Sequence, residues 1–232
     1  MYFGFDSTYI LVLIGAVICM LASGKVNRTF AKYSQVRSRL GLTGREAAER
    51  ILRTNGIHDV QVNHISGKLT DHYDPRNKTL SLSDSTYNST SVAAIGVAAH
   101  ECGHAVQHAT GYVPLKIRGA LVPVANLGSM AAWPLIIIGL FIRSDAASFL
   151  INLGIILFSA AVLFQLVTLP VEFNASSRAV KVLDSSKMLY PEEVDATKKV
   201  LGAAALTYVA SAAAMILQLL RLVMIGGRRS DN

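Results

Sequence analysis

Four long stretches of the chain contain no Asp, Glu, Lys, Arg or His. They cover residues 7–24, 119–142, 146–171 and 200–220. A helix needs about 20 apolar residues to cross roughly 30 Å of hydrocarbon, so each stretch is long enough to form a membrane span. The sequence therefore predicts about four transmembrane helices. Arg221, at the end of the last stretch, leaves open that this segment lies partly in the membrane interface instead of crossing fully.

Two polar segments separate these stretches, at 25–118 and 172–199, and the short connection 143–145 makes the second and third spans a tight hairpin. If all four stretches cross the membrane, both polar segments emerge on the same side and can build one domain. A Thr-Gly-Arg-Glu capping box at 43–46 opens its first helix. The remaining expected elements are strands at 60–65, 69–73 and 79–82, and helices at 89–111, at 172–183 and from 191 into the fourth span.

The net charge is +7, and a cluster of basic residues follows the first apolar stretch: Lys25, Arg28, Lys32, Arg37 and Arg39. No Lys or Arg precedes that stretch, as one would in a secretory signal peptide. The positive-inside rule then places the carboxyl end of the first helix, and with it both polar segments, in the cytoplasm. The charge indicates contact with the lipid bilayer and not with nucleic acid. The two cysteines imply no disulfide framework.

The chemistry of the chain is concentrated in His100-Glu101-Cys102-Gly103-His104, which matches the HExxH motif. Two His four residues apart lie on one face of a helix, so both imidazoles can bind the same Zn²⁺ ion. Glu101 can serve as the general base toward a zinc-activated water. The motif falls on a predicted helix that follows an alternating strand, the order found in zincins. An accidental match on a packed helix is the alternative.

A catalytic zinc site needs a third protein ligand, and two residues are candidates. His108 continues the four-residue spacing, but it is about 12 Å from His100 along a straight helix. We therefore expect His108 to be a surface or cleft residue. Glu172 directly follows the third apolar stretch, so the topology returns it to the side of the motif helix at the start of a second helix. Glu172 would complete a gluzincin site of two His and one Glu, with one zinc per chain.

The motif and the run Leu-Pro-Val-Glu-Phe-Asn-Ala-Ser-Ser-Arg-Ala at 169–179 resemble the bacterial neutral zinc metallopeptidase family typified by YugP. The likeness covers nearly the whole chain. It implies a multi-pass peptidase of the bacterial plasma membrane, with His100, His104 and Glu172 as zinc ligands and Glu101 as the base. More distantly the chain resembles HtpX-like and prenyl-protein membrane proteases. Those relatives often carry an Asp four residues after the ligand Glu, to orient a ligand His, where this chain has Ser176.

Further residues are candidates for supporting roles. Arg178, Ser176 and Tyr190 could stabilise an oxyanion or support a ligand, although each could equally be structural. The strand of Thr79, Leu80, Ser81 and Leu82 could bind substrate by strand addition if its edge is exposed, or it could be a plain sheet strand.

Together these patterns predict a mainly α integral membrane protein with about four transmembrane helices and a small α+β zincin-like catalytic domain. Its predicted function is zinc-dependent endopeptidase, hydrolysing membrane or membrane-proximal polypeptides, either alone or with a membrane-protein partner or further copies of itself. The alternative is a non-enzymatic membrane scaffold or partner-binding protein with an accidental or decayed metal site. Glu101 favours the enzyme, because a structural zinc site needs no base and is normally closed by four ligands. A transporter is disfavoured because no apolar stretch has an ionisable residue in its interior.

Overall fold

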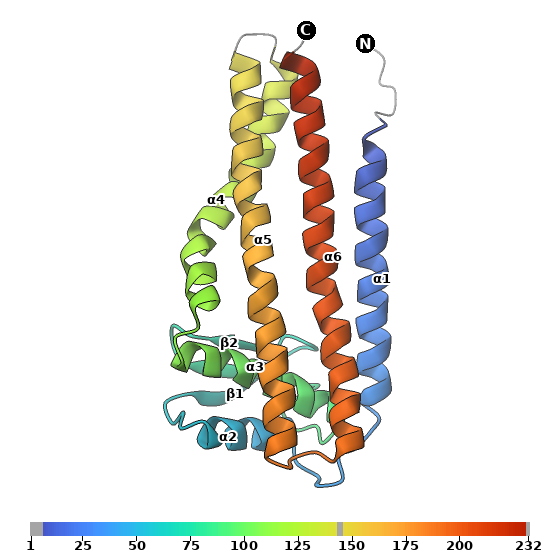
Figure 1. Ribbon diagram of the computed structural model, residues 1–232, viewed down its shortest axis with the longest axis vertical. Helices are drawn as coiled ribbons and strands as arrows, with labels where there is room; N and C mark the ends of the chain where they lie inside the picture. The colour runs from blue at the N-terminus through green and yellow to red at the C-terminus, as the bar shows by residue number, and fades with distance from the viewer. Residues whose placement is uncertain (1–6, 143–145, 231–232) are drawn as a thin grey trace. The chain divides into compact units, whose positions relative to one another are not determined.

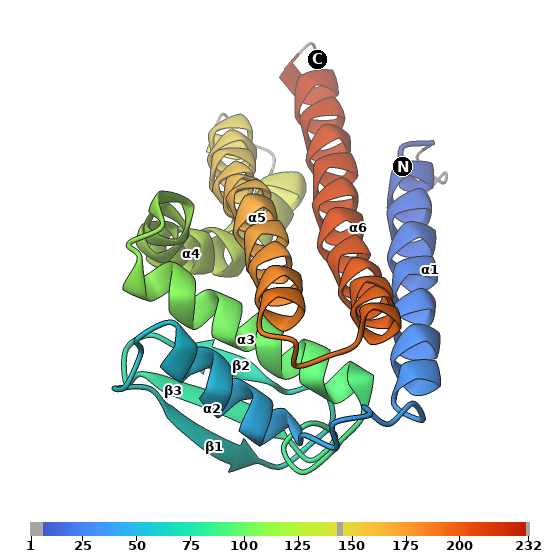
Figure 2. The same ribbon diagram turned by 60° about the horizontal axis from the view of Figure 1, so that its bottom comes forward.

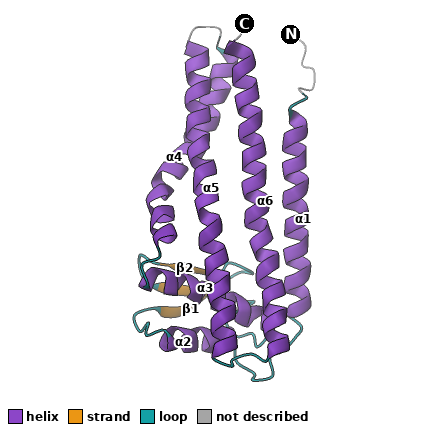
Figure 3. Ribbon diagram, in the orientation of Figure 1, coloured by secondary structure: helices purple, strands orange, loops and turns teal. Residues whose placement is uncertain are grey.

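A computed structural model describes residues 7–142 and 146–230, which form a mainly helical chain with one small sheet (Figures 1 and 3). The predicted hairpin connection at 143–145 lies outside the described residues. In chain order the elements are α1 (Tyr9–Tyr33), α2 (Gly44–Thr54), β1 (Gln61–Ile65), β2 (His72–Asp74), β3 (Thr79–Ser83), α3 (Val92–Ala109), α4 (Val113–Phe141), α5 (Ala146–Ser185) and α6 (Pro191–Ser230).

Four of these helices are long and apolar enough to cross a membrane: α1, α4, α5 and α6. Their surfaces are apolar as well, since Phe141 is 80% exposed, Met130 75% and Leu21 69%. Large side chains of this kind are costly to expose to water and favourable to expose to lipid. The expectation of four membrane-spanning segments therefore agrees with the helices that the chain forms. The fourth, α6, continues as one helix through Arg221.

The chain divides into two compact units, which are described separately. The first contains Met1–Ala22, Lys116–Leu169 and Thr207–Asn232. Within it α4 and α5 pack closely at glycines: a Cβ added to Gly128 would lie 2.4 Å from the carbonyl oxygen of Leu157. Ala132 and Ile136 of α4 share a buried cluster with Phe158 of α5. Small residues at such contacts let helix backbones approach in lipid, where the hydrophobic effect does not drive association.

The second unit contains Ser23–Leu115 and Pro170–Leu206, and it holds the sheet. The strand order is β1-β3-β2, with β1 parallel and β2 antiparallel to β3. The predicted capping box opens α2, where Thr43 and Glu46 each accept the other's backbone N–H. The apolar face of α2, including Ala47, Ala48 and Ile51, packs on α3. Figure 2 shows α3 between this layer of sheet and α2 on one side and the end of α5 on the other.

The expectation that a new helix begins at Glu172 is wrong. Helix α5 runs unbroken from Ala146 to Ser185, with Pro170 inside it and Glu172 two residues further on. Proline removes only one backbone hydrogen bond, and a long apolar helix has enough packing on its flanks to tolerate that loss. The carboxylate is therefore held in the interior of a rigid helix instead of at a frayed end.

Candidate metal centre

Helix α3 positions the HExxH motif. Ser91 caps it by accepting a hydrogen bond from the Ala94 amide at 3.2 Å, and nearly every residue from Val92 to Val106 is buried. Because the helix is packed on both sides, its orientation is fixed by its neighbours. His100 and His104 follow one another on the same face, with ring centroids 4.8 Å apart and ring planes at 86°. The four-residue spacing thus places both imidazoles on one face of the helix, as expected from the sequence.

Glu172 reaches the same point from α5. Its Oε2 atom lies 3.2 Å from Nε2 of His100 and 3.5 Å from Nε2 of His104. One ligand atom from each of the three residues lies within 4.8 Å of the others, and within 7–142 and 146–230 they are the one such group of three or more His, Cys, Asp or Glu. The helices can approach because residue 103 is glycine: a Cβ there would be 2.5 Å from the Ala175 carbonyl oxygen.

Each histidine is held through its other ring nitrogen. Nδ1 of His100 lies 3.0 Å from Oγ of Ser176, and Nδ1 of His104 lies 3.1 Å from Oε1 of Gln107. Ser176 therefore occupies the place for which the sequence comparison with more distant proteases suggested an Asp. Ligand histidines are commonly oriented in this way by a second polar group.

Gln107, which is fully buried, is the residue that the sequence reading missed. Its Nε2 donates to the Val171 carbonyl at 2.8 Å and to Oδ1 of Asn174 at 3.0 Å. Oδ1 of Asn174 also accepts from Nε of Arg178 at 2.8 Å. The Val171 carbonyl can only accept, so the nitrogen of the Gln107 amide must face it. The Arg178 guanidinium can only donate, so the oxygen of the Asn174 amide must face it. Oε1 of Gln107 must then face His104, and His104 must donate to it from Nδ1.

Glu101 is 8% exposed and has no hydrogen-bond or ion-pair partner among the residues that the structure describes. Its neighbour Cys102 points into the core, where its thiol lies 3.6 Å from the Ala48 carbonyl oxygen and burial raises the pKa well above the usual value. Burial alone would lower the pKa of His104, but the hydrogen bond to Glu172 and the charges of Glu101 and Glu172 raise it on balance. The Glu101 carboxylate is thus close enough to raise the pKa of His104, yet it forms no hydrogen bond or ion pair in the described chain.

The other candidates lie elsewhere. His108 is bonded through Nδ1 to the hydroxyl of Tyr73 at 2.8 Å and is not in the three-residue group, in agreement with the expectation. Tyr190 stacks under the guanidinium of Arg39 at 4.8 Å, and its amide donates to Glu193. In the described chain neither contact links Tyr190 to the His–Glu group, so the structure does not bring it to the site.

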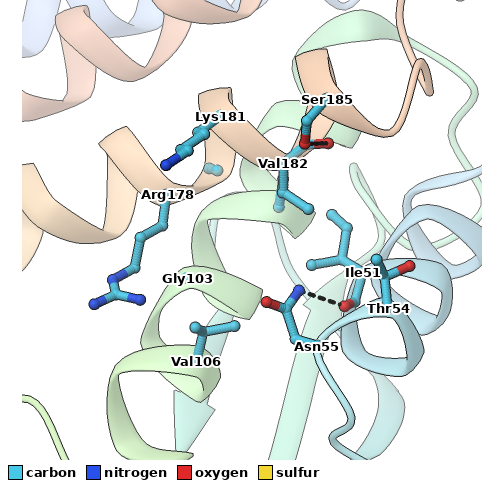
Figure 4. A pocket seen from close by; sticks show the side chains of 11 residues that line it. Ile51, Thr54, Asn55, Gly103, Val106, Arg178, Lys181, Val182 and Ser185 are labelled. Atoms are coloured by element: carbon cyan, nitrogen blue, oxygen red, sulfur yellow. Dashed lines mark hydrogen bonds between the residues drawn. The ribbon is translucent and has the colours of Figure 1, made fainter. Parts of the chain in front are cut away.

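Arg178, besides its bond to Asn174, lines a cavity of about 310 Å³ between α2, α3 and α5 (Figure 4). Val106 and Gly103 form part of its wall, and Lys181 lies one turn further along α5. The Arg178 guanidinium also lies 5.8 Å from the ring of Tyr112. Arg178 therefore holds Asn174, which in turn bonds to Gln107, the residue that contacts His104.

The expectation that residues 79–82 offer a free strand edge is wrong. β3 is the middle strand, with Leu80 opposite both Val62 of β1 and Tyr73 of β2. Leu80 and Leu82 are completely buried. A substrate cannot add to a strand whose two edges are already paired. The free edges of this sheet belong to β1 and β2, and β2 is the one that contacts α3 through Tyr73 and His108.

The donor set of the three-residue group fits a zinc ion. Two imidazole nitrogens and one carboxylate oxygen are the ligands of catalytic zinc sites, which leave a further position open. With Nδ1 of His104 donating to Gln107, Nε2 is the ring atom that faces Glu172, and in the neutral imidazole it would offer its lone pair to a metal ion there. Such sites also hold each ligand histidine through its other ring nitrogen, as Ser176 and Gln107 do here.

Comparisons with known proteins agree with this interpretation. Residues 8–227 match the family model described as "Putative neutral zinc metallopeptidase". The chain is 48% identical over 218 residues to a Bacillus subtilis (strain 168) protein named "Putative membrane protease YugP", covering 94% of this chain and 96% of the relative. No solved structure matches significantly.

Proposed function

Because the chain belongs to the family of neutral zinc metallopeptidases, we propose that it is a membrane-embedded zinc endopeptidase acting on membrane or membrane-proximal polypeptides. The observation that carries the proposal is the convergence of His100, His104 and Glu172 near Glu101, whose carboxylate has no hydrogen-bond or ion-pair partner among the described residues. Its similarity to a membrane protease and its four apolar helices support a membrane location. The basic cluster after the first apolar stretch supports a site that faces the cytoplasm.

In this proposal His100, His104 and Glu172 hold one zinc ion per chain. When bound, zinc would supply Lewis-acid polarisation of a scissile carbonyl and of water. Glu172 is well suited to its role because it is 3% exposed and sits inside a continuous helix, so little entropy is lost on binding the metal.

Glu101 is assigned as the general base and later the general acid. Its carboxylate accepts a proton from the attacking water and delivers that proton to the amine that leaves. The carboxylate lies close enough to His104 for its charge to help raise the pKa of that imidazole, so it is near the proposed metal position. A structural zinc site needs no general base, so a carboxylate at this place favours the enzyme over a scaffold.

Gln107 and Ser176 are assigned as positioning residues. By accepting from Nδ1–H, each would leave the Nε2 lone pair of its histidine unprotonated and directed at the metal. Gln107 does more than Ser176, since its own amide is tied to the backbone of α5 through Val171. It thereby connects the position of His104 to the helix that carries Glu172.

The test is cleavage of an unstructured polypeptide, such as fluorescently labelled casein, by the purified full-length protein in micelles with added zinc. Glu101→Gln removes the base without changing the shape of the side chain. It should lower the rate by at least about 100-fold, the usual contribution of a positioned acid–base group. Glu49→Gln, a matched change at an exposed ion pair on α2, should leave the rate unaltered. Undiminished cleavage by Glu101→Gln would exclude the assigned mechanism.

A further inference from the structure

A basic groove lies between the end of α1 and the beginning of α6, within the second unit. It has a volume of about 580 Å³, in the range of ligand-binding sites. Lys25, Arg28 and Lys32 of α1 and Lys199 of α6 line it together with Gly202 and Leu206. Phe30 and Val200, both buried, belong to one cluster that fixes the two helices against each other. The two segments lie side by side in Figures 1 and 2.

The four cations of this groove are not neutralised by any carboxylate within residues 7–142 and 146–230. No Asp or Glu lines the groove, and none of the four forms an ion pair with a carboxylate of the described chain. Lys32 has only a ring contact with Tyr33, at 5.4 Å. The neighbouring Lys198, by contrast, is paired with Asp195 at 2.9 Å. Four like charges around one concave surface repel one another and attract an anion.

The lining of the groove changes from basic to apolar side chains along its length. Lys25 directly follows the charge-free stretch 7–24, and Lys199 directly precedes the charge-free stretch 200–220. Both cations therefore stand where their helices pass from polar to apolar sequence. Leu206, about two helical turns beyond Lys199, extends the wall into the apolar stretch. A ligand that fits has an anionic head and a hydrocarbon tail, which a free phosphate does not have.

The positive-inside effect explains basic residues after a span, but it does not require a groove. Here two helices contribute cations that are more than 160 residues apart in sequence to one concave surface. Residue 202 is exposed and lacks a side chain, and a Cβ built there would meet nothing within 4 Å. That glycine keeps the floor of the groove open, at a position where a helix interior otherwise favours larger residues.

We propose that this groove binds one anionic phospholipid, its phosphate held by Lys25, Arg28, Lys32 and Lys199 and its acyl chains running along Leu206. The site is separate from the metal centre, so the proposal goes beyond the proposed function. It makes the contact between the two helices dependent on lipid composition.

The test is native mass spectrometry of the full-length protein, stripped of lipid in detergent and then titrated with phosphatidylglycerol or phosphatidylcholine. The wild type should bind one phosphatidylglycerol in preference to phosphatidylcholine. Lys25→Gln/Lys199→Gln should weaken that binding by at least about tenfold, since each cation near a lipid surface contributes on the order of fivefold. Gly202→Leu should weaken it as well by filling the floor, with all charges retained.

The matched control is Lys116→Gln/Lys198→Gln, which removes the same net charge outside the groove. It should keep the preference for phosphatidylglycerol, and thermal unfolding should confirm that all variants are folded. Equal loss in the control would show non-specific attraction and overturn the proposal. So would unchanged binding by Gly202→Leu, or binding of glycerol 3-phosphate as tight as that of the lipid, which would identify a free anion as the occupant.

Discussion

Oε1 of Gln107 lies 3.1 Å from Nδ1 of His104, and the same amide donates to the Val171 carbonyl on the helix that carries Glu172. One buried side chain therefore connects a candidate zinc ligand on α3 to the backbone of α5. Because the Val171 carbonyl can only accept, the amide has one orientation, and the tautomer of His104 follows from it.

Gln107→Ala should lower zinc affinity by about 10- to 100-fold, the usual effect of losing a group that orients a ligand histidine. Gln107→Glu keeps a side-chain oxygen that can accept from Nδ1 of His104, but it loses the N–H groups that donate to Val171 and Asn174 on α5. It should recover much of the zinc affinity while remaining less thermally stable than the wild type. Competition with a fluorescent zinc chelator measures the first quantity, and thermal unfolding of the metal-free proteins measures the second.

Asn55→Ala is the control for this series, because it removes a comparable amide that bonds only to the Ile51 carbonyl in the described chain. It should reduce stability modestly and leave zinc affinity unchanged. If Gln107→Ala and Asn55→Ala alter zinc affinity equally, Gln107 is a packing residue and its positioning role is refuted.

Ser176→Ala should have a smaller effect than Gln107→Ala, about tenfold in zinc affinity, because a serine hydroxyl is less restrained than the Gln107 amide. Ser176→Thr retains the hydroxyl and should recover most of the affinity. The same chelator competition measures both variants. Recovery with alanine as complete as with threonine would mean that His100 needs no support from this hydroxyl.

Gly103→Ala should destabilise the protein even though alanine is the better helix former. The added Cβ would meet backbone atoms of Ala175 at 2.5–3.0 Å, so α3 and α5 must separate. Overpacking of this kind costs about 1–3 kcal/mol in the free energy of unfolding. Gly119→Ala, at a helix position where the Cβ meets nothing within 4 Å, should instead stabilise by up to about 1 kcal/mol.

Differential scanning fluorimetry in detergent compares the two glycine variants directly. The closeness of the helices also predicts that Gly103→Ala weakens zinc binding, because His104 and Glu172 move apart. A Gly103→Ala protein with wild-type melting temperature and wild-type zinc affinity would show that the approach of α3 to α5 is not needed at the site.

The three candidate metal ligands could be predicted from the sequence to different degrees. His100 and His104 follow from local spacing, because a helix places residues four apart on one face. The approach of Glu172 required a topological argument from charge-free stretches, and the structure does bring this carboxylate close to both histidines, although the assumed helix start was wrong. Helix α5 also continues through Pro170, because local propensity does not decide whether a long packed helix ends at a proline.

The role of Gln107 and the place of the 79–82 strand depend on contacts that sequence spacing does not encode. Gln107 bonds to residues 64 and 67 positions later, so its partners on α5 cannot be read from local spacing. The signal that could have found it is its place three residues after His104, one turn along the ligand face. Likewise, alternation predicted a strand at 79–82, but only pairing on both sides makes it the middle strand.

The central claim is that His100, His104 and Glu172 form one zinc site served by Glu101, and metal analysis of the purified protein tests it most directly. Folded wild type and Glu101→Gln should each contain about one zinc per chain, because Glu101 is not a ligand. Glu172→Gln and His104→Ala should contain nearly none at the same zinc concentration. Folded wild type without zinc, or Glu172→Gln that keeps a full equivalent, would contradict the account.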